Sequence, residues 1–240
     1  MKALAASTVL AISLGLGLVA CTREASPPGI AFAPWDKSHA SKPDFAQVDY
    51  AHPIPAAEMA KITPEYLATL EQEQIDQIYA RLTAGPIPDG AFDGKILLPK
   101  GSNGKLRLAD IVGGFAGKAL ELKGLMLDDL GEAIWRGKVF YREERVLRNR
   151  IEDLSVLKKM GLVTGEPKKM DFHGKETWLL FPAKLYCGQS LLDARRESII
   201  IDYFFTDEIP GYQENPDFLA GRRGLRVRDE IRMIRPGLYL

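Results

Sequence analysis

Apolar and polar residues alternate with a period of two along much of the chain after residue 134, which is the pattern of half-buried β-strands. Turn-forming residues separate the alternating segments. His173-Gly174-Lys175 predicts a tight hairpin, and Asp193-Ala194-Arg195-Arg196 predicts another turn. The pattern predicts strands over 134–141, 145–151, 169–172, 177–181, 184–187, 198–205 and 225–234, with a short one at 95–99.

Helical spacing occurs in two segments nearer the N-terminus. Thr63 followed by Pro64 is typical of a helix start, and apolar residues then recur every three or four positions as far as Leu82. A second stretch with this spacing predicts a helix over 108–133. The prolines between residues 22 and 58 disfavour regular structure, so this segment is expected to be a tether whose aromatic residues pack in part on the domain.

The order of these elements indicates the fold class. Strands and helices do not alternate in the manner of a parallel βαβ sheet. Many short strands separated by turns favour an antiparallel sheet rolled into a barrel. The expected class is therefore mainly β (α+β), with one or two packed N-terminal helices and a single globular domain over 59–240. The long connection over 211–224 is a candidate lid or mouth loop.

Residues 1–20 begin with one positive charge and continue as small and apolar residues, which is the shape of a signal peptide rather than of a membrane-spanning helix. The following Leu18-Val19-Ala20-Cys21 resembles the lipobox of bacterial lipoproteins. That resemblance implies cleavage before Cys21, acylation of its thiol, and a tether over 21–58. Thr22 in place of Asp implies an outer-membrane location facing the periplasm. An ordinary signal peptide followed by a chance cysteine is the alternative.

Composition narrows the functional classes. The chain carries 32 basic and 32 acidic residues, so no charge excess indicates a nucleic-acid partner. With Cys21 lipidated, Cys187 has no disulfide partner, and its apolar surroundings predict a packed thiol. His39, His52 and His173 lack metal-ligand spacing, and no catalytic motif is present, so we predict no metal, no cofactor and no catalytic residue.

Two aspartates interrupt apolar strands. Alternation over 225–234 puts Asp229 on the apolar face and Arg228 on the other. Asp202 lies within a second apolar strand, next to Tyr203. A carboxylate on an apolar face is costly unless it is paired, so both aspartates require an explanation.

Two explanations are open. In the first, the aspartates pair with Arg148, Arg150 or an arginine of 226–232 and fix the strand register. In the second, Asp, Tyr and Arg groups inside a barrel orient the polar head of a ligand.

The hexapeptide Trp135-Arg136-Gly137-Lys138-Val139-Phe140 resembles a Trp-x-Gly-Lys-x-Phe element of lipocalin-like bacterial proteins of unknown function. The resemblance spans roughly residues 87–240. It implies a small antiparallel lipocalin-like barrel with no established activity, and a further strand after the last residues. The other stretches that carry it are Asn149-Arg150, Ile201-Asp202-Tyr203, Val227 to Arg232, and Pro236 to Leu240.

The function expected from these features is non-enzymatic: an envelope lipoprotein that binds a small amphiphilic or apolar ligand, or a lipid, in a barrel pocket. One alternative is an enzyme that uses Asp202, Tyr203, Asp229 and Arg228 on the same scaffold. Another is a structural or assembly lipoprotein, which a barrel filled by its own side chains would favour. The candidate ligand-binding residues are Trp135, Arg148, Arg150, Asp202, Tyr203, Arg228 and Asp229.

Replacing Cys21 by serine tests the anchor. Each buried methylene of an acyl chain contributes about 0.8 kcal/mol to membrane binding, so a protein with two or more chains stays on the membrane. Cys21→Ser should therefore move the protein from the membrane fraction to the soluble fraction of lysed cells, as measured by immunoblot. Cys187→Ser is the matched control and should stay with the membrane. Unchanged retention of Cys21→Ser would contradict the lipid anchor.

Overall fold

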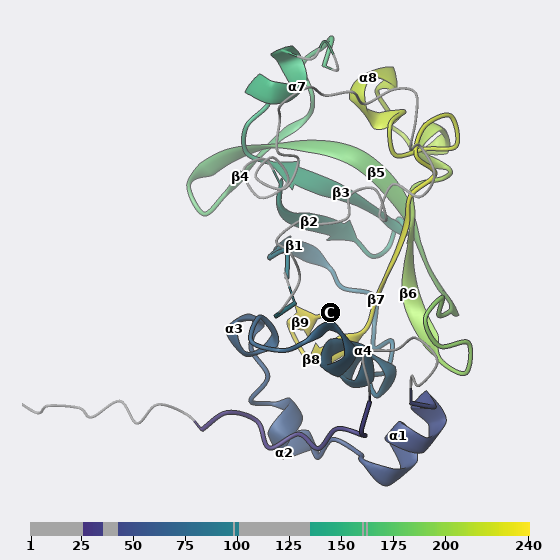
Figure 1. The fold of residues 1–240 in the computed structure, drawn as a ribbon. Helices are drawn as coiled ribbons and strands as arrows, with labels where there is room; N and C mark the ends of the chain where they lie inside the picture. Colours follow the sequence, from purple (N-terminus) through teal and green to yellow (C-terminus); the bar gives the residue numbers. More distant parts are fainter. Residues whose placement is uncertain (1–25, 36–42, 98, 101–134, 160, 162) are drawn as a thin grey trace, which may run out of the picture.

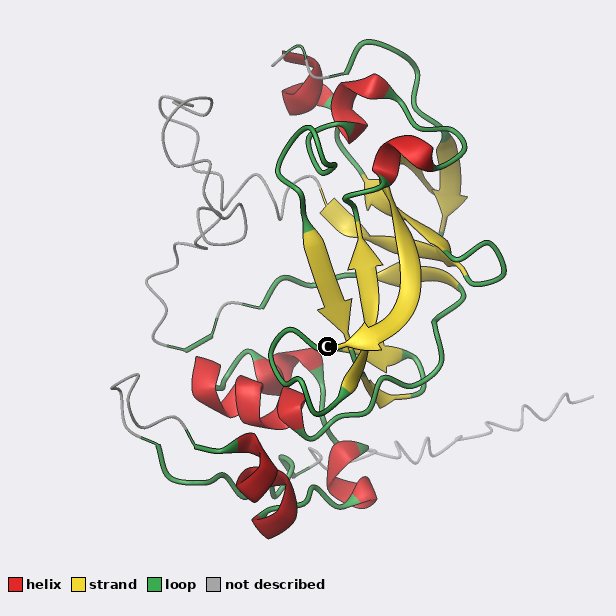
Figure 2. Cartoon of the chain, turned by 90° about the vertical axis from the view of Figure 1, so that its right-hand side faces the viewer, coloured by secondary structure: helices red, strands yellow, loops and turns green. Residues whose placement is uncertain are grey.

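The computed structural model describes residues 26–35, 43–97, 99–100, 135–159, 161 and 163–240 (Figures 1 and 2). Cys21, the signal segment and the predicted helix over 108–133 lie outside these residues. The described chain forms an antiparallel sheet with short helices gathered at two opposite ends (Figure 2). Within this part of the chain, no helix is both long enough and apolar enough to cross a bilayer.

Seven strands form one sheet in the order β1-β2-β3-β5-β6-β7, and β4 pairs with β5 beside this path. Every pair of neighbouring strands is antiparallel. This confirms the mainly-β, α+β class, which the alternation predicts because one face of each strand is buried. The strands are β1 (Gly90–Asp93), β2 (Trp135–Tyr141), β3 (Val146–Ile151), β4 (Lys169–Phe172), β5 (Lys175–Gln189), β6 (Glu197–Asp202) and β7 (Arg228–Ile231).

Several strands differ from the predicted ones for local reasons. The segments predicted at 177–181 and 184–187 are one strand, β5, which continues through a register shift opposite β3 where Phe181 has a φ of 50°. Residues 95–97 form no strand. The strand that pairs with β2 is β1, which lies earlier in the chain, at Gly90–Asp93. The segment predicted at 198–205 ends as a strand at Asp202. The two predicted turns, at His173-Gly174 and at Asp193 to Arg196, are confirmed.

The segment predicted as one strand at 225–234 is two, β7 and β8 (Met233–Arg235). The backbone of Arg232 leaves the main sheet and exchanges hydrogen bonds of 2.9 Å with Leu240. β8 then pairs with β9 (Leu238–Tyr239), whose Tyr239 ring lies 5.9 Å from that of Phe92 in β1. Among the described residues no pairing joins β1 to β7, so the sheet is open there.

Alternating side chains divide the sheet into two faces. The core face carries Leu147, Leu185 and Ile201 among a central apolar cluster, and the second face carries Arg148 and Asp202. The other buried members of the central cluster are Ile87, Phe140, Ala183, Ile199, Tyr203 and Ala220.

Short helices form a second apolar cluster at one end of the sheet (Figure 1). The predicted helix 63–82 is two helices: Thr63 caps the first by accepting a 3.1 Å hydrogen bond from Tyr66 N, and Glu71 begins the second. The helices at this end are α1 (Phe45–Ala51), α2 (Ala56–Met59), α3 (Pro64–Leu67) and α4 (Gln72–Ala80). At the other end lie α7 (Ser155–Lys159), η2 (Thr206–Glu208) and α8 (Glu214–Asp217).

The segment expected to be a tether is in contact with the domain where it is described. Gln77 of α4 exchanges hydrogen bonds of 2.9 and 3.1 Å with the backbone of Ala33, and Arg81 donates to Ala31 O. Phe32 packs against the second cluster, as its aromatic character predicts, and α1 and α2 form despite the prolines around them.

Arg232 joins this helical end to the sheet. Its side chain is fully buried and donates to Ser198 Oγ of β6 at 2.8 Å and to Tyr79 O of α4 at 3.0 Å. Its guanidinium also lies 4.6 Å from the centre of the Tyr79 ring. A cation at this place satisfies a carbonyl at the C-terminal end of α4, where the helix dipole favours positive charge.

Replacing Arg232 by alanine should lower the free energy of unfolding by about 3 kcal/mol, because two buried charged hydrogen bonds are lost and their acceptors stay buried. Chemical denaturation measures this change. Arg223→Ala is the control, since Arg223 forms an exposed pair with Glu214 and its loss should leave the free energy of unfolding nearly unchanged. Equal losses in the two variants would refute this role for Arg232.

Candidate functional site

The pleat of the sheet separates the residues singled out in the sequence. Asp229 of β7 is paired with Ile201, and Arg228 with Asp202. Asp229 and Tyr203 therefore lie on the core face, while Asp202 and Arg228 lie on the second face. The set proposed for an enzyme is thus divided between two sides of one sheet.

A polar network lies on the core face around Lys138 of β2. The ammonium donates to Tyr203 OH at 2.8 Å and to Asn149 Oδ1 at 3.1 Å, and its Nζ lies 3.5 Å from Asp229 Oδ2. The Trp135 indole also donates to Asn149 Oδ1, at 2.9 Å. We call these five residues the Lys138 network. Four strands or their ends supply it, so it forms only in the folded sheet.

Asn149 holds the network in register. Its Nδ2 donates to Tyr203 OH at 3.0 Å and to Phe181 O at 3.0 Å, at the register shift of β5. The amide therefore uses both its oxygen and its nitrogen within the network. A Cβ on Gly94 would come within 2.0 Å of the Trp135 ring, so the glycine leaves the space that this ring occupies.

The network is largely shielded from water. The Lys138 side chain is 18% exposed and that of Asp229 is 39% exposed. Burial opposes the charge of Lys138, but interaction with Tyr203 and Asp229 outweighs it and raises the pKa of the ammonium. Burial also raises the pKa of the Tyr203 phenol. At neutral pH the site therefore contains a lysine cation and a protonated phenol, beside the partly exposed Asp229.

Asp202 forms a separate cluster on the second face. It is fully buried, and its carboxylate accepts from Tyr186 OH at 2.7 Å, from Arg228 Nη2 at 2.9 Å and from Phe204 N at 3.0 Å. This confirms the pairing with an arginine of 226–232 that fixes strand register. Asp229 differs from that expectation, because its partner is Lys138 rather than an arginine.

The structure does not bring Arg148 and Arg150 into the Lys138 network. Arg148 donates to Pro210 O, beside the 211–224 connection. Arg150 pairs with Asp93, donates to Phe92 O at 3.2 Å, and lies 3.8 Å from the centre of the Phe172 ring. Both arginines lie on the second face, where Arg150 holds β1 to its neighbours.

The 211–224 connection, predicted as a lid or mouth loop, is tied to β5. Asp217 of α8 accepts from Phe181 N at 2.6 Å and from Gln213 N at 2.9 Å. Asp217 is almost fully buried, and this burial raises the pKa of its carboxyl. The contact places α8 next to the same register shift that Asn149 supports from the core face.

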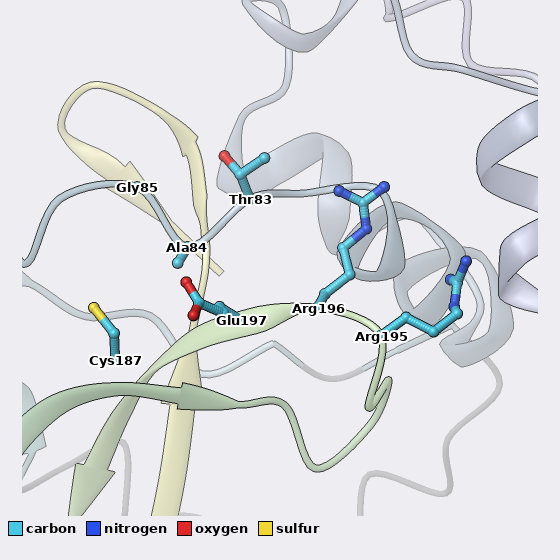
Figure 3. A pocket seen from close by; sticks show the side chains of 7 residues that line it. All are labelled: Thr83, Ala84, Gly85, Cys187, Arg195, Arg196 and Glu197. Carbon is cyan, nitrogen blue, oxygen red and sulfur yellow. The ribbon is translucent and has the colours of Figure 1, made fainter.

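Cys187 is exposed, so the prediction of a packed thiol is wrong. It lies near the end of β5, beyond the central cluster, and its side chain lines an open depression of about 560 Å³ (Figure 3). Figure 3 shows Cys187 and Glu197 on one side and Arg195 and Arg196 on the other. None of the seven lining residues belongs to the Lys138 network, and Thr83, Ala84 and Gly85 complete the lining.

Sequence reasoning found Trp135, Tyr203 and Asp229 of the network but missed Lys138 and Asn149. A signal was available, because both residues lie in the stretches that carry the lipocalin-like resemblance. β2 and β3 are joined by a short turn, and the register that follows pairs Lys138 with Asn149.

Comparisons with known protein families, with characterised proteins and with solved structures found no match to this chain. Within the described residues, no three His, Cys, Asp or Glu side chains converge in a way that would hold a metal ion.

The raised pKa values of Tyr203 and Lys138 predict a loss of stability in alkali. In the unfolded chain both groups lose their protons near pH 10, whereas the folded protein holds them. The stabilisation is thus complete below about pH 10 and is lost as pH rises through the folded-state pKa values.

Urea denaturation at about pH 8 and about pH 11 measures the total loss, which Tyr203→Phe should reduce because it removes one of the groups whose pKa the fold raises. Tyr50→Phe, at a position that is 87% exposed, should behave as the unmodified protein does. An alkaline loss that is the same in all three proteins would show that Tyr203 does not contribute to it.

Proposed function

We propose that this chain is a lipoprotein of the bacterial envelope, anchored through Cys21 in the outer membrane and facing the periplasm, and that it binds an amphiphile with an acidic head group. The head group is received by Lys138 on the core face. The acyl or other apolar part lies along the apolar side chains of the same face. This is the ligand-binding function expected from the sequence, and the proposal now names Lys138 as the group that binds the polar head of the ligand.

The observation that carries the proposal is the state of Lys138. A lysine on an apolar sheet face is retained as a cation, and its ion-pair partner among the described residues is the partly exposed Asp229. Two neutral acceptors, Asn149 and Tyr203, hold the remaining ammonium protons. An incoming carboxylate or phosphate can therefore join or replace Asp229 without leaving the cation unpaired.

The surroundings of the network suit the apolar part of such a ligand. Phe92, Phe181, Val227 and Ile231 are only partly buried and pack against the central cluster. A partly covered apolar surface beside a single charged group is the usual composition of a site for an amphiphile.

We also propose that the sheet forms the wall of a lipocalin-like barrel. Supporting this, all neighbouring strands are antiparallel and one face of the sheet carries the central cluster. The β8–β9 hairpin bridges part of the interval between the edge strands, since Tyr239 contacts Phe92 of β1.

A structural or assembly role is the second candidate. Its specific support is that buried side chains of this chain itself fill the middle of the core face. The enzymatic alternative loses its basis, since Asp202 and Arg228 lie on the side of the sheet opposite to Tyr203 and Asp229.

Oleate is a suitable probe for the Lys138 site, because it combines a carboxylate with an apolar chain. For the chain from Ser26 onward, prepared without lipid, calorimetric titration should show oleate binding, and the tryptophan fluorescence of the chain should change with it because Trp135 lies in the network. Lys138→Met should weaken oleate affinity roughly tenfold to a hundredfold, the equivalent of one charged hydrogen bond.

Lys184→Met is the matched control. Lys184 is a half-exposed lysine on the second face of β5 that pairs with Glu208, outside the network. Its replacement should leave oleate affinity within a factor of about two. Equal affinities of Lys138→Met and the unmodified chain would exclude the Lys138 site. Repeated absence of a bound amphiphile in native mass spectra, together with no oleate binding, would favour the structural role.

A further inference from the structure

Large exposed apolar side chains are confined to two short segments of the described chain. They are Tyr50, which is 87% exposed, Leu191, which is 65% exposed, and Leu192, which is 40% exposed. Tyr50 lies on α1, and the two leucines lie in the loop between β5 and β6. These three are the large apolar side chains that stand exposed among the residues whose side chains are described, and their grouping at one end of the molecule marks a candidate contact surface.

An ion pair holds the two segments together. Arg196 at the base of the β5–β6 loop pairs with Asp49 of α1, the residue next to Tyr50. Although the segments are far apart in the sequence, this contact puts them on one end of the molecule. We call Tyr50, Leu191 and Leu192 the apolar end patch.

The start of the described chain lies at this same end. Gly29 N donates to Glu58 Oε2 of α2 at 2.6 Å, and Arg81 donates to both Ala31 O and His52 O, the residue after α1. Figure 1 shows this N-terminal segment in purple beside α1 and α2, with α7 and α8 at the opposite end.

Chain length fixes which end faces the membrane. Five residue steps separate Cys21 from Ser26, and fully extended they reach at most about 18 Å. A domain of about 200 residues is roughly 40 Å across. An acylated Cys21 in the bilayer therefore keeps the end that carries Ser26 close to the membrane surface and excludes an orientation in which the opposite end, with α7 and α8, rests on it.

The chemistry of the apolar end patch fits a bilayer interface. Tyrosine is enriched at the boundary between headgroups and acyl chains, and leucine side chains enter the apolar layer. The nearby arginines are already paired, Arg196 with Asp49 and Arg195 with Asp193, so the contact does not depend on anionic headgroups.

From this juxtaposition we infer that the apolar end patch is a membrane-docking surface that sets the orientation of the domain on the bilayer. The inference rests on the lipid anchor proposed above and is independent of the Lys138 site. A docked patch holds the domain at the membrane in a second place, besides the acyl chains of Cys21. The Lys138 network then keeps a constant orientation relative to the bilayer.

The test uses the full mature lipoprotein, reconstituted into vesicles of phosphatidylethanolamine and phosphatidylglycerol that contain lipids brominated on their acyl chains. In a Cys187→Ser background, a fluorophore is attached at Leu191→Cys, at Leu192→Cys or at Glu166→Cys. Bromine quenches fluorophores at the depth of the acyl chains. Quenching should be severalfold greater at 191 and 192 than at 166, which is exposed on the connection between α7 and β4.

A coupled variant asks whether the patch acts as one surface. A fluorophore at Tyr50→Cys should be quenched in the Cys187→Ser background, and adding Leu191→Glu with Leu192→Glu should reduce that quenching to the level at 166. All these side chains are exposed, so their replacement does not disturb the core.

The outcomes distinguish the patch from the anchor. Protein that floats with the vesicles but shows equal quenching at 191, 192 and 166 would overturn the docking surface and leave the anchor in place. Protein that does not float with the vesicles would remove the anchor, and the docking surface with it. Quenching at Tyr50→Cys that is unaffected by the two glutamates would also overturn the surface.

Discussion

The structure depends on one requirement: a charge taken out of water must be given polar partners. Four largely buried charges meet it where parts of the fold join. Arg232 connects α4 with the sheet, and Arg150 holds β1 against β2. Asp202 connects β5 with β7 on the second face, while Lys138 connects β2 with β3 and β7 on the core face. Burial of one strand face already excludes a slip by one residue, and the paired charges add a second constraint on the register.

Local patterns predicted the parts of the fold that depend on local physics. Alternation located β2, β3 and β4 closely, because burial of one strand face leaves that period in the sequence. The Thr63 cap was also predicted, since an N-cap uses only the next turn. The pattern failed where a distant partner decides the backbone: Arg232 leaves the sheet to pair with Leu240, which no period within 225–234 indicates.

In the candidate site, too, local patterns predicted some residues, and distant partners decided the others. Alternation predicted that Asp229 lies on the apolar face of its strand, where a carboxylate is conspicuous among apolar residues. Lys138 and Asn149 were missed because a lysine and an asparagine in a strand normally face solvent, so nothing in their own segments marks them as buried. Only the pairing of β2 with β3, and the arrival of Tyr203 from β6, encloses them.

The end of the molecule that carries α1 to α4 binds the N-terminal segment, which a flexible tether would leave free. Gln77 and Arg81 of the α4 region bind the backbone of residues 31 and 33, so the N-terminal segment of the described chain is fastened to the second apolar cluster. That cluster, with α4 and the β8–β9 hairpin, lies between this N-terminal segment and the sheet (Figure 1). The Lys138 network and the end that carries α1 and α2 share no residue, so changes at one should leave the energetics of the other nearly unaltered.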